Sequence, residues 1–145
     1  ASEDEAVAVL AGRGPPVAEL ADRMKEAMPP GAELPRLIAI HGTADEVVSP
    51  ENTRRLAAAW LLVQGRSSSE PDESERGRGG RAPYAYDRRR WSAGDPAPVE
   101  TWLVEGLGHA WSGGSSDGTW ADPAGPDATA AVLRSFGLVR DGPEP

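Results

Sequence analysis

Asp45 and His109 are the two residues of this chain best placed to do chemistry. Each follows a short apolar run that predicts a buried strand, residues 34–40 before Asp45 and residues 99–105 before His109. Open sheets covered by helices bind their ligands at the carboxyl ends of the strands, where both residues fall. A carboxylate and an imidazole at such an edge are candidates for acid–base chemistry.

The other reactive residue types offer less. His41 also lies at a strand end, where a histidine is expected to act as a structural hydrogen-bonding residue. With two histidines, no cysteine and no His-x-x-x-His spacing, neither a metal site nor a cofactor is expected. Ser116 stands in one literal Gly-x-Ser-x-Gly match, residues 114–118, but no apolar strand precedes it and no helix follows directly. It is therefore not expected to be a nucleophile.

Three helices and three strands are expected to position these residues. Apolar spacing predicts helices over residues 17–28, from Ser49-Pro50 to about Gln64, and after Pro126-Asp127, the last with Val132, Leu133 and Phe136 facing inward. Strands are predicted over residues 34–40, from Tyr84 to near Trp91, and over residues 99–105, and the last two are compatible with a hairpin. This order favours a parallel or mixed sheet covered by helices, around a thin core.

Residues 65–82 differ in composition from the rest of the chain. They carry no large apolar side chain and cannot bury enough surface to offset the entropy of ordering. A mobile, low-complexity surface loop is expected at about residues 65–82.

The composition argues against several classes of partner. The 145 residues fit one domain, and the longest apolar runs fall far short of the roughly 18 residues of a membrane span. The net charge of −8 argues against nucleic acid as the main partner. Arg88, Arg89 and Arg90 lie beside aromatic residues and could form a local basic patch, but a solvated strand end is the favoured interpretation.

Three segments resemble a known family. They are residues 41–50, HGTADEVVSP, residues 106–114, GLGHAWSGG, and residues 120–128, WADPAGPDA. From about Pro35 to Phe136 the chain resembles the poly(3-hydroxybutyrate) depolymerase and feruloyl or acetylxylan esterase group of α/β-hydrolases. The resemblance implies an α/β fold with a mostly parallel sheet flanked by helices.

The same resemblance implies roles for individual residues. It makes Asp45 the acid and His109 the base of a Ser-His-Asp triad. Independently of the resemblance, Trp111 is a candidate substrate-binding residue that could line a groove with Trp120, because aromatic faces suit sugar rings and polyester chains; the alternative is that Trp111 only closes the histidine loop. The family's Gly-x-Ser-x-Gly elbow stands upstream of the acid, but residues 1–44 contain only Ser2 and no elbow. Residues 1–145 are therefore expected to be the C-terminal part of one α/β-hydrolase domain, beginning inside a larger fold.

The implied function is a serine carboxylesterase that acts on a polyester or on a feruloylated or acetylated polysaccharide through an acyl-enzyme. The isolated chain is expected to be inactive because its nucleophile is missing, and the N-terminal half of the same fold is an expected partner besides the ester substrate. The alternative is a catalytically silent fragment with a binding or structural role. The resemblance favours secretion, although residues 1–5, ASEDE, are not a signal peptide.

Overall fold

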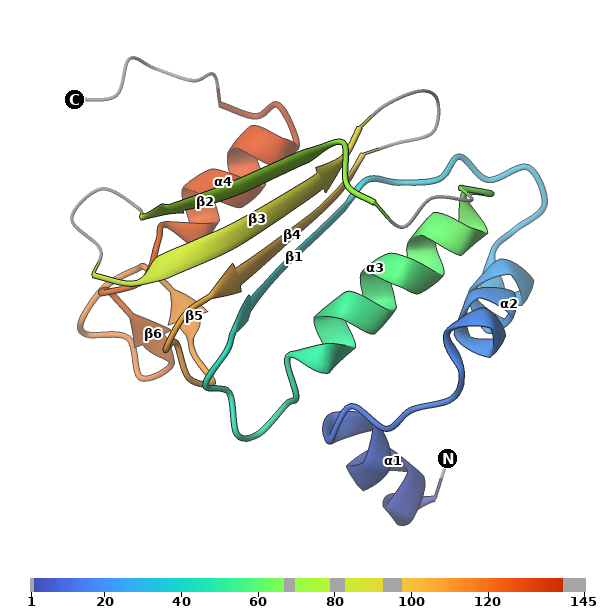
Figure 1. Cartoon of the computed structure of the whole chain (residues 1–145), viewed down its shortest axis with the longest axis horizontal. Coiled ribbons are helices and arrows are strands. Elements are labelled where there is room, and N and C mark those ends of the chain that lie inside the picture. Colours follow the sequence, from blue (N-terminus) through green and yellow to red (C-terminus); the bar gives the residue numbers. More distant parts are fainter. Residues whose placement is uncertain (1, 67–69, 79–82, 93–97, 140–145) are drawn as a thin grey trace.

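A mixed sheet of four strands lies at the centre of the molecule (Figure 1). The computed structural model describes residues 2–66, 70–78, 83–92 and 98–139. The sheet order is β1-β4-β3-β2, with the bounds Leu37–Gly42 for β1, Val99–Val104 for β4, Ala85–Trp91 for β3 and Glu73–Arg78 for β2. A second, small sheet pairs β5 (Trp111–Ser112) with β6 (Ala121–Asp122) in parallel.

The expectation of a mostly parallel sheet, as in the C-terminal portion of an α/β-hydrolase, is wrong. In the main sheet only β1 and β4 run parallel among the described strands, whereas β3 pairs with both β4 and β2 in the antiparallel sense. The reason lies in the connections. Residues 79–84 join β2 to β3 and residues 92–98 join β3 to β4, and both are shorter than the dozen or so residues that a parallel crossover needs. The hairpin of β3 and β4 is confirmed.

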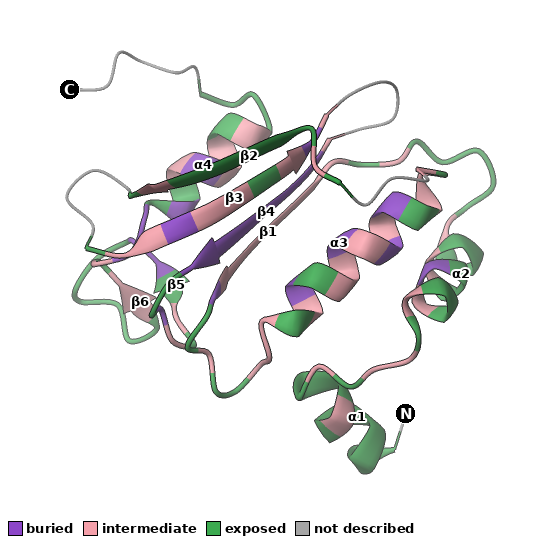
Figure 2. Ribbon diagram, in the orientation of Figure 1, coloured by how far each residue is buried: buried purple, intermediate pink, exposed green. Residues whose placement is uncertain are grey.

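Two helices cover opposite faces of the sheet and form two small cores. Helix α3 (Glu51–Val63) places Ala57 and Leu61 against Val99 and Trp91 on one face. Helix α4 (Ala128–Ser135) places Ala131 against a cluster on the other face, made of Tyr86, Trp102, Val104 and Leu107. Because both faces are covered, β4 is buried at all six positions, including the polar residues Glu100 and Thr101 (Figure 2).

The remaining helices lie outside this sandwich. Helix α2 (Val17–Ala27) packs on α3, and α1 (Glu3–Leu10), which was not predicted, begins with a capping box between Ser2 and Glu5. The predicted helix bounds at residues 17–28 and near Gln64 are confirmed to within about one residue. The prediction that Phe136 faces inward is wrong. The buried face of α4 is formed by Ala128 and Ala131, whereas Phe136, just past the last helical residue, is about half exposed beneath the Arg36 guanidinium.

The segment expected to be a loop over residues 65–82 contains strand β2, so that prediction is wrong for Glu73–Arg78; residues 67–69 and 79–82 lie outside the described part of the chain. The strand needs no apolar side chain because β3 supplies its backbone partners, from Glu73 opposite Arg90 to Arg78 opposite Ala85. Opposite charges on the two strands add to this pairing.

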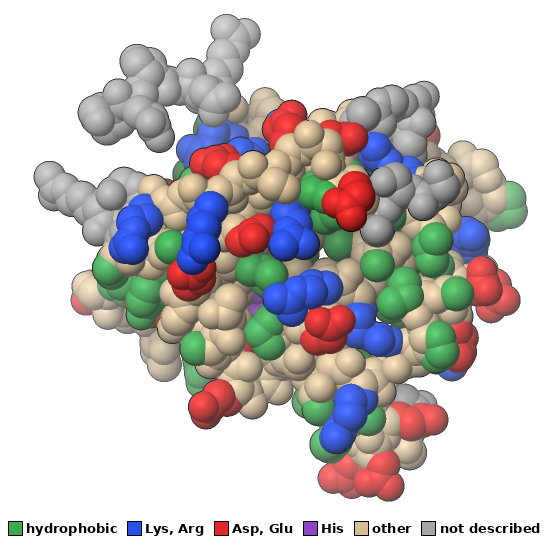
Figure 3. All heavy atoms as spheres, in the orientation of Figure 1, with side chains coloured by type: hydrophobic (Ala, Val, Ile, Leu, Met, Phe, Trp, Pro, Cys, Tyr) green, Lys and Arg blue, Asp and Glu red, His purple; other side chains and the backbone are tan. Residues whose placement is uncertain are grey.

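The three arginines lie within β3, not at a solvated strand end. Arg88 contacts the carboxylates of Glu75 and Glu100 at 3.4 and 2.8 Å, and Arg90 lies 3.8 Å from the carboxylate of Glu73. Arg89 pairs with Asp87 on its own strand. Acidic and basic side chains are accordingly interspersed over the face shown in Figure 3.

The two edges of the main sheet differ in character. The β2 edge carries charged side chains, as edge strands of soluble proteins usually do. The β1 edge reads LIAIHG, carries no Asp, Glu, Lys or Arg, and has no partner strand on its outer side in the described part of the chain. No helix within the described ranges is long and apolar enough to cross a membrane.

We expect the purified chain to self-associate through the outer edge of β1, because no strand of the described ranges pairs with its backbone groups there and its side chains are mostly apolar. Sedimentation velocity at increasing concentration should show a growing population of larger species. Ala39→Lys, which charges this edge, should reduce the association. Ser74→Lys makes the same change at the same register level of the opposite edge and should not. A chain that stays monomeric at every concentration would contradict the expectation.

Candidate functional site

The parallel pairing of β1 with β4 brings two loops together at one edge of the sheet. The register ends with Gly42 opposite Val104, and the loops that carry Asp45 and His109 begin there. Backbone hydrogen bonds extend the contact beyond the strands, from the Thr43 amide to the Val104 carbonyl at 2.9 Å and from the Ala44 amide to the Leu107 carbonyl at 3.0 Å. The two loops therefore form one unit.

Gly42 is the point where the two loops cross. A Cβ atom at this position would lie 2.0 Å from the carbonyl oxygen of Leu107, well inside van der Waals contact. The clash is with backbone, which cannot swing aside as a long side chain can. Only glycine allows the approach on which the position of Asp45 relative to His109 depends.

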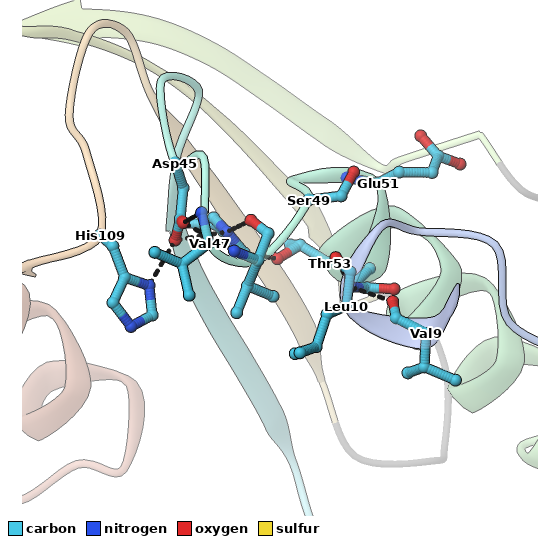
Figure 4. Close-up of polar contacts among 11 residues, drawn as sticks. Val9, Leu10, Asp45, Val47, Ser49, Glu51, Thr53 and His109 are labelled. Carbon is cyan, nitrogen blue, oxygen red and sulfur yellow. Dashed lines mark hydrogen bonds and ion pairs between the residues drawn. The ribbon is translucent and has the colours of Figure 1, made fainter. Parts of the chain in front are cut away.

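Asp45 is held by hydrogen bonds on both carboxylate oxygens (Figure 4). Its Oδ1 accepts the amides of Val47 and Val48 at 2.9 and 2.8 Å. Its Oδ2 lies 2.9 Å from Nδ1 of His109. The Asp45 side chain is 6% exposed and the His109 side chain 45% exposed, so the acid is buried while the imidazole faces solvent. The proximity predicted for Asp45 and His109 is confirmed, and their catalytic roles stay predictions.

His41 contacts the same carboxylate from the interior. Its Nδ1 lies 2.9 Å from the Thr53 hydroxyl, and its Nε2 lies 2.9 Å from the Val48 carbonyl oxygen and 3.2 Å from Oδ2 of Asp45. The expected hydrogen-bonding role of His41 is confirmed. Its contact with Asp45 was not predicted, although the spacing of the two residues in the motif HGTAD could have suggested it.

A cavity of about 450 Å³ opens beside the pair. His109, Trp111 and Trp120 line it, together with Ile40, His41, Gly42, Asp45, Val48, Gly108 and Ala110. The Trp120 side chain meets the His109 ring edge-on, with 6.3 Å between the ring centroids. The indole of Trp111 is half exposed and donates a hydrogen bond to Thr129 on α4. Trp111 therefore lies at the cavity and also ties the histidine loop to α4.

None of the residues lining this cavity carries a hydroxyl or thiol group. Ser116 lies in an exposed turn between β5 and β6, not at a strand-to-helix elbow. Within the described ranges, no three histidine, aspartate or glutamate side chains form a group that could hold a metal ion. The described residues supply an acid and a base but no nucleophile beside them.

Comparison with known proteins adds no relatives. No protein-family model matches the chain, and no curated protein is significantly similar to it in sequence.

The Asp45–His109 contact has an electrostatic consequence. Burial raises the pKa of the Asp45 carboxyl, but the hydrogen bonds from the Val48 amide and the His109 imidazole lower it, and the result lies below the ordinary value of 3.8. A carboxyl whose pKa is depressed on folding stabilises the folded state fully above its unfolded pKa. This contribution is lost as the pH falls through the folded pKa.

Asp45→Asn should therefore lower the free energy of unfolding by about 1.5–3 kcal/mol at neutral pH, the range for hydrogen bonds to a charged group. The difference between the two proteins should shrink as the pH falls below about 3.8. Chemical denaturation of the wild type and the variant at a series of pH values measures this difference in the free energy of unfolding. A difference that stays constant down to pH values where carboxylates are protonated would contradict the assignment.

Gly42→Ala should destabilise the fold and separate the two loops, at a cost of about 1–3 kcal/mol or more for forcing a methyl group against backbone. Gly108→Ala is the matched control, since a Cβ there meets no atom within 4 Å. Thermal unfolding compares the two variants. Equal melting temperatures would show that the loops can separate at no cost.

Proposed function

We propose that Asp45 and His109 are the acid and base of a serine carboxylesterase whose nucleophile comes from a separate segment of polypeptide. The observation that carries the proposal is the 2.9 Å contact between Oδ2 of a buried carboxylate and Nδ1 of a half-exposed imidazole. The resemblance of residues 41–50 and 106–114 to the depolymerase and esterase group supports it.

In this proposal His109 moves the protons. With Nδ1 directed to Asp45, Nε2 takes the proton of a serine hydroxyl as its oxygen attacks the ester carbonyl. The tetrahedral intermediate then collapses, the C–O bond of the ester breaks, and the leaving alcohol takes the proton from Nε2. Water hydrolyses the acyl-enzyme by the same route. Asp45 stays ionised throughout and stabilises the imidazolium, which suits a carboxyl with a lowered pKa.

The residues that line the cavity are consistent with the proposed substrate, an ester with extended flat or apolar groups. Trp111 and Trp120 are 51% and 71% exposed and stand beside His109, so their rings are available for contact. Aromatic faces suit sugar rings and polyester chains, which are the substrate classes proposed here.

The outer edge of β1, which has no partner strand among the described residues, could accept the segment that carries the nucleophile. β1 ends at Gly42, three residues before Asp45. A strand that paired with this edge in parallel would end beside the cavity, because the carboxyl ends of parallel strands meet at the same edge of a sheet. The same segment would have to supply the donors that stabilise the oxyanion.

A binding role is the second candidate, and the lack of a hydroxyl or thiol among the cavity-lining residues favours it. In that case the exposed tryptophans would bind the ligand and the Asp45–His109 pair would serve only to position the loop.

The test has two parts. The isolated chain should show no turnover of a short-chain nitrophenyl ester above the buffer blank, because an acid and a base without a nucleophile cannot form an acyl-enzyme. The longest coding sequence that contains this chain should show turnover, reduced on the order of 10⁴-fold by Asp45→Asn. His109→Ala should be at least as damaging, and Asp117→Asn, in the exposed turn, should have no effect.

Two results would overturn the proposal. Turnover by the isolated chain that is lost in Ser116→Ala would place the nucleophile within these residues. A full-length product without turnover that still binds polyester or acylated polysaccharide would support the binding role instead.

A further inference from the structure

His41 is largely buried between the sheet and helix α3, and its hydrogen bonds determine which ring nitrogen carries a proton. The side chain is 13% exposed. The Val48 carbonyl oxygen can only accept a hydrogen bond, so the Nε2 atom 2.9 Å away must donate. In the neutral ring Nδ1 is then an acceptor, and the Thr53 hydroxyl, also 2.9 Å away, donates to it.

The Nε2 atom of His41, whose hydrogen bond goes to the Val48 carbonyl, also lies close to the carboxylate of Asp45. It lies 3.2 Å from Oδ2, the oxygen that His109 contacts at 2.9 Å. Two imidazoles thus lie close to one oxygen, the largely buried His41 and the half-exposed His109, and both border the cavity. The other oxygen, Oδ1, is held separately by the amides of Val47 and Val48.

The supporting groups stand on regular elements, whereas Asp45 and His109 stand on loops. His41 belongs to β1 and Thr53 to the first turn of α3. A functional side chain on a loop is positioned best when neighbours on rigid elements hold its rotamer through hydrogen bonds. His41 acts on the carboxylate in two ways: its Nε2–H donates to the carbonyl of Val48, the residue whose amide donates to Oδ1 of Asp45, and its ring lies 3.2 Å from Oδ2.

We propose that His41, oriented by Thr53, is a positioning residue that aims the Asp45 carboxylate at Nδ1 of His109. This inference rests on the proposed function, in which Asp45 acts as the acid, and adds a residue to it. Sequence reasoning gave His41 only a role in stability.

The test measures His109 by NMR in the chain itself, which needs neither nucleophile nor substrate. In the wild-type chain labelled with ¹⁵N-histidine, His109 should be protonated at Nδ1, with a slowly exchanging proton. His41→Phe keeps a buried ring but removes the donor. It should speed exchange of that proton by about tenfold, as expected for the loss of one hydrogen bond of ordinary strength, and shift His109 toward the Nε2–H tautomer.

Two further variants separate positioning from general destabilisation. His41→Gln restores an N–H donor near the position of Nε2 and should recover much of the wild-type signature. Thr53→Val removes the hydroxyl that orients His41 and should shift the His109 signature in the same direction as His41→Phe. Backbone amide spectra of β3 and β4 show whether each variant keeps its fold, and if His41→Phe does not fold, Thr53→Val and His41→Gln carry the test.

The outcomes distinguish this inference from the proposed function. In one outcome, His41→Phe and Thr53→Val leave the tautomer and proton exchange rate of His109 unchanged while Asp45→Asn alters them. That result would overturn the positioning role of His41 but not the pairing of Asp45 with His109. If Asp45→Asn does not alter them either, both are overturned. A signature that responds to His41→Phe and Thr53→Val in a protein without esterase activity supports the positioning role and counts against the esterase.

Discussion

The parallel pairing of β1 with β4 is the constraint on which the candidate site depends. Asp45 and His109 are 64 residues apart, and nothing in the local sequence brings them together. They meet because two parallel strands end at the same edge and their loops cross where Gly42 admits the Leu107 carbonyl. The antiparallel strand β3 runs the other way, so its carboxyl end lies beside the start of β4, far from the two loops. It contributes no residue to the cavity.

The elements that could be predicted from the sequence are those with a characteristic pattern of apolar residues within their own segment. The helices over residues 17–28 and 49–64 and the strands around β1, β3 and β4 follow from apolar spacing, and the proximity of Asp45 to His109 follows from their places after strands. Strand β2 has no such pattern, because a polar edge strand gets its stability from the backbone of its neighbour. Pattern analysis of ESERGR alone cannot reveal pairing partners that lie 7–17 residues further along the chain.

The resemblance led to a wrong prediction of a mostly parallel sheet, whereas the lengths of the connections between the strands predict a mixed one. The three matched segments describe the ends of strands and the loops after them, so they carry no information on which strands run parallel. The short connections on either side of β3 decide that, and they make the sheet mixed. The burial of β4 on both faces could not be predicted from the sequence either. Its Glu100 is buried because, in the folded sheet, the carboxylate accepts hydrogen bonds from Arg88 and Trp102.

The difference in exposure between Asp45 and His109 defines what the site can do. A carboxylate that is 6% exposed must have its hydrogen bonds in place when the chain folds, since an unpaired buried charge is too costly. The Val47 and Val48 amides and the His109 imidazole supply them, so the Asp45 carboxylate is held in place before any ligand arrives. His109 keeps nearly half of its side chain exposed toward a cavity bordered by two tryptophans. Whether this site catalyses a reaction or only binds a ligand therefore depends on the chemical group that enters the cavity. The arrangement of Asp45 and His109 is compatible with both.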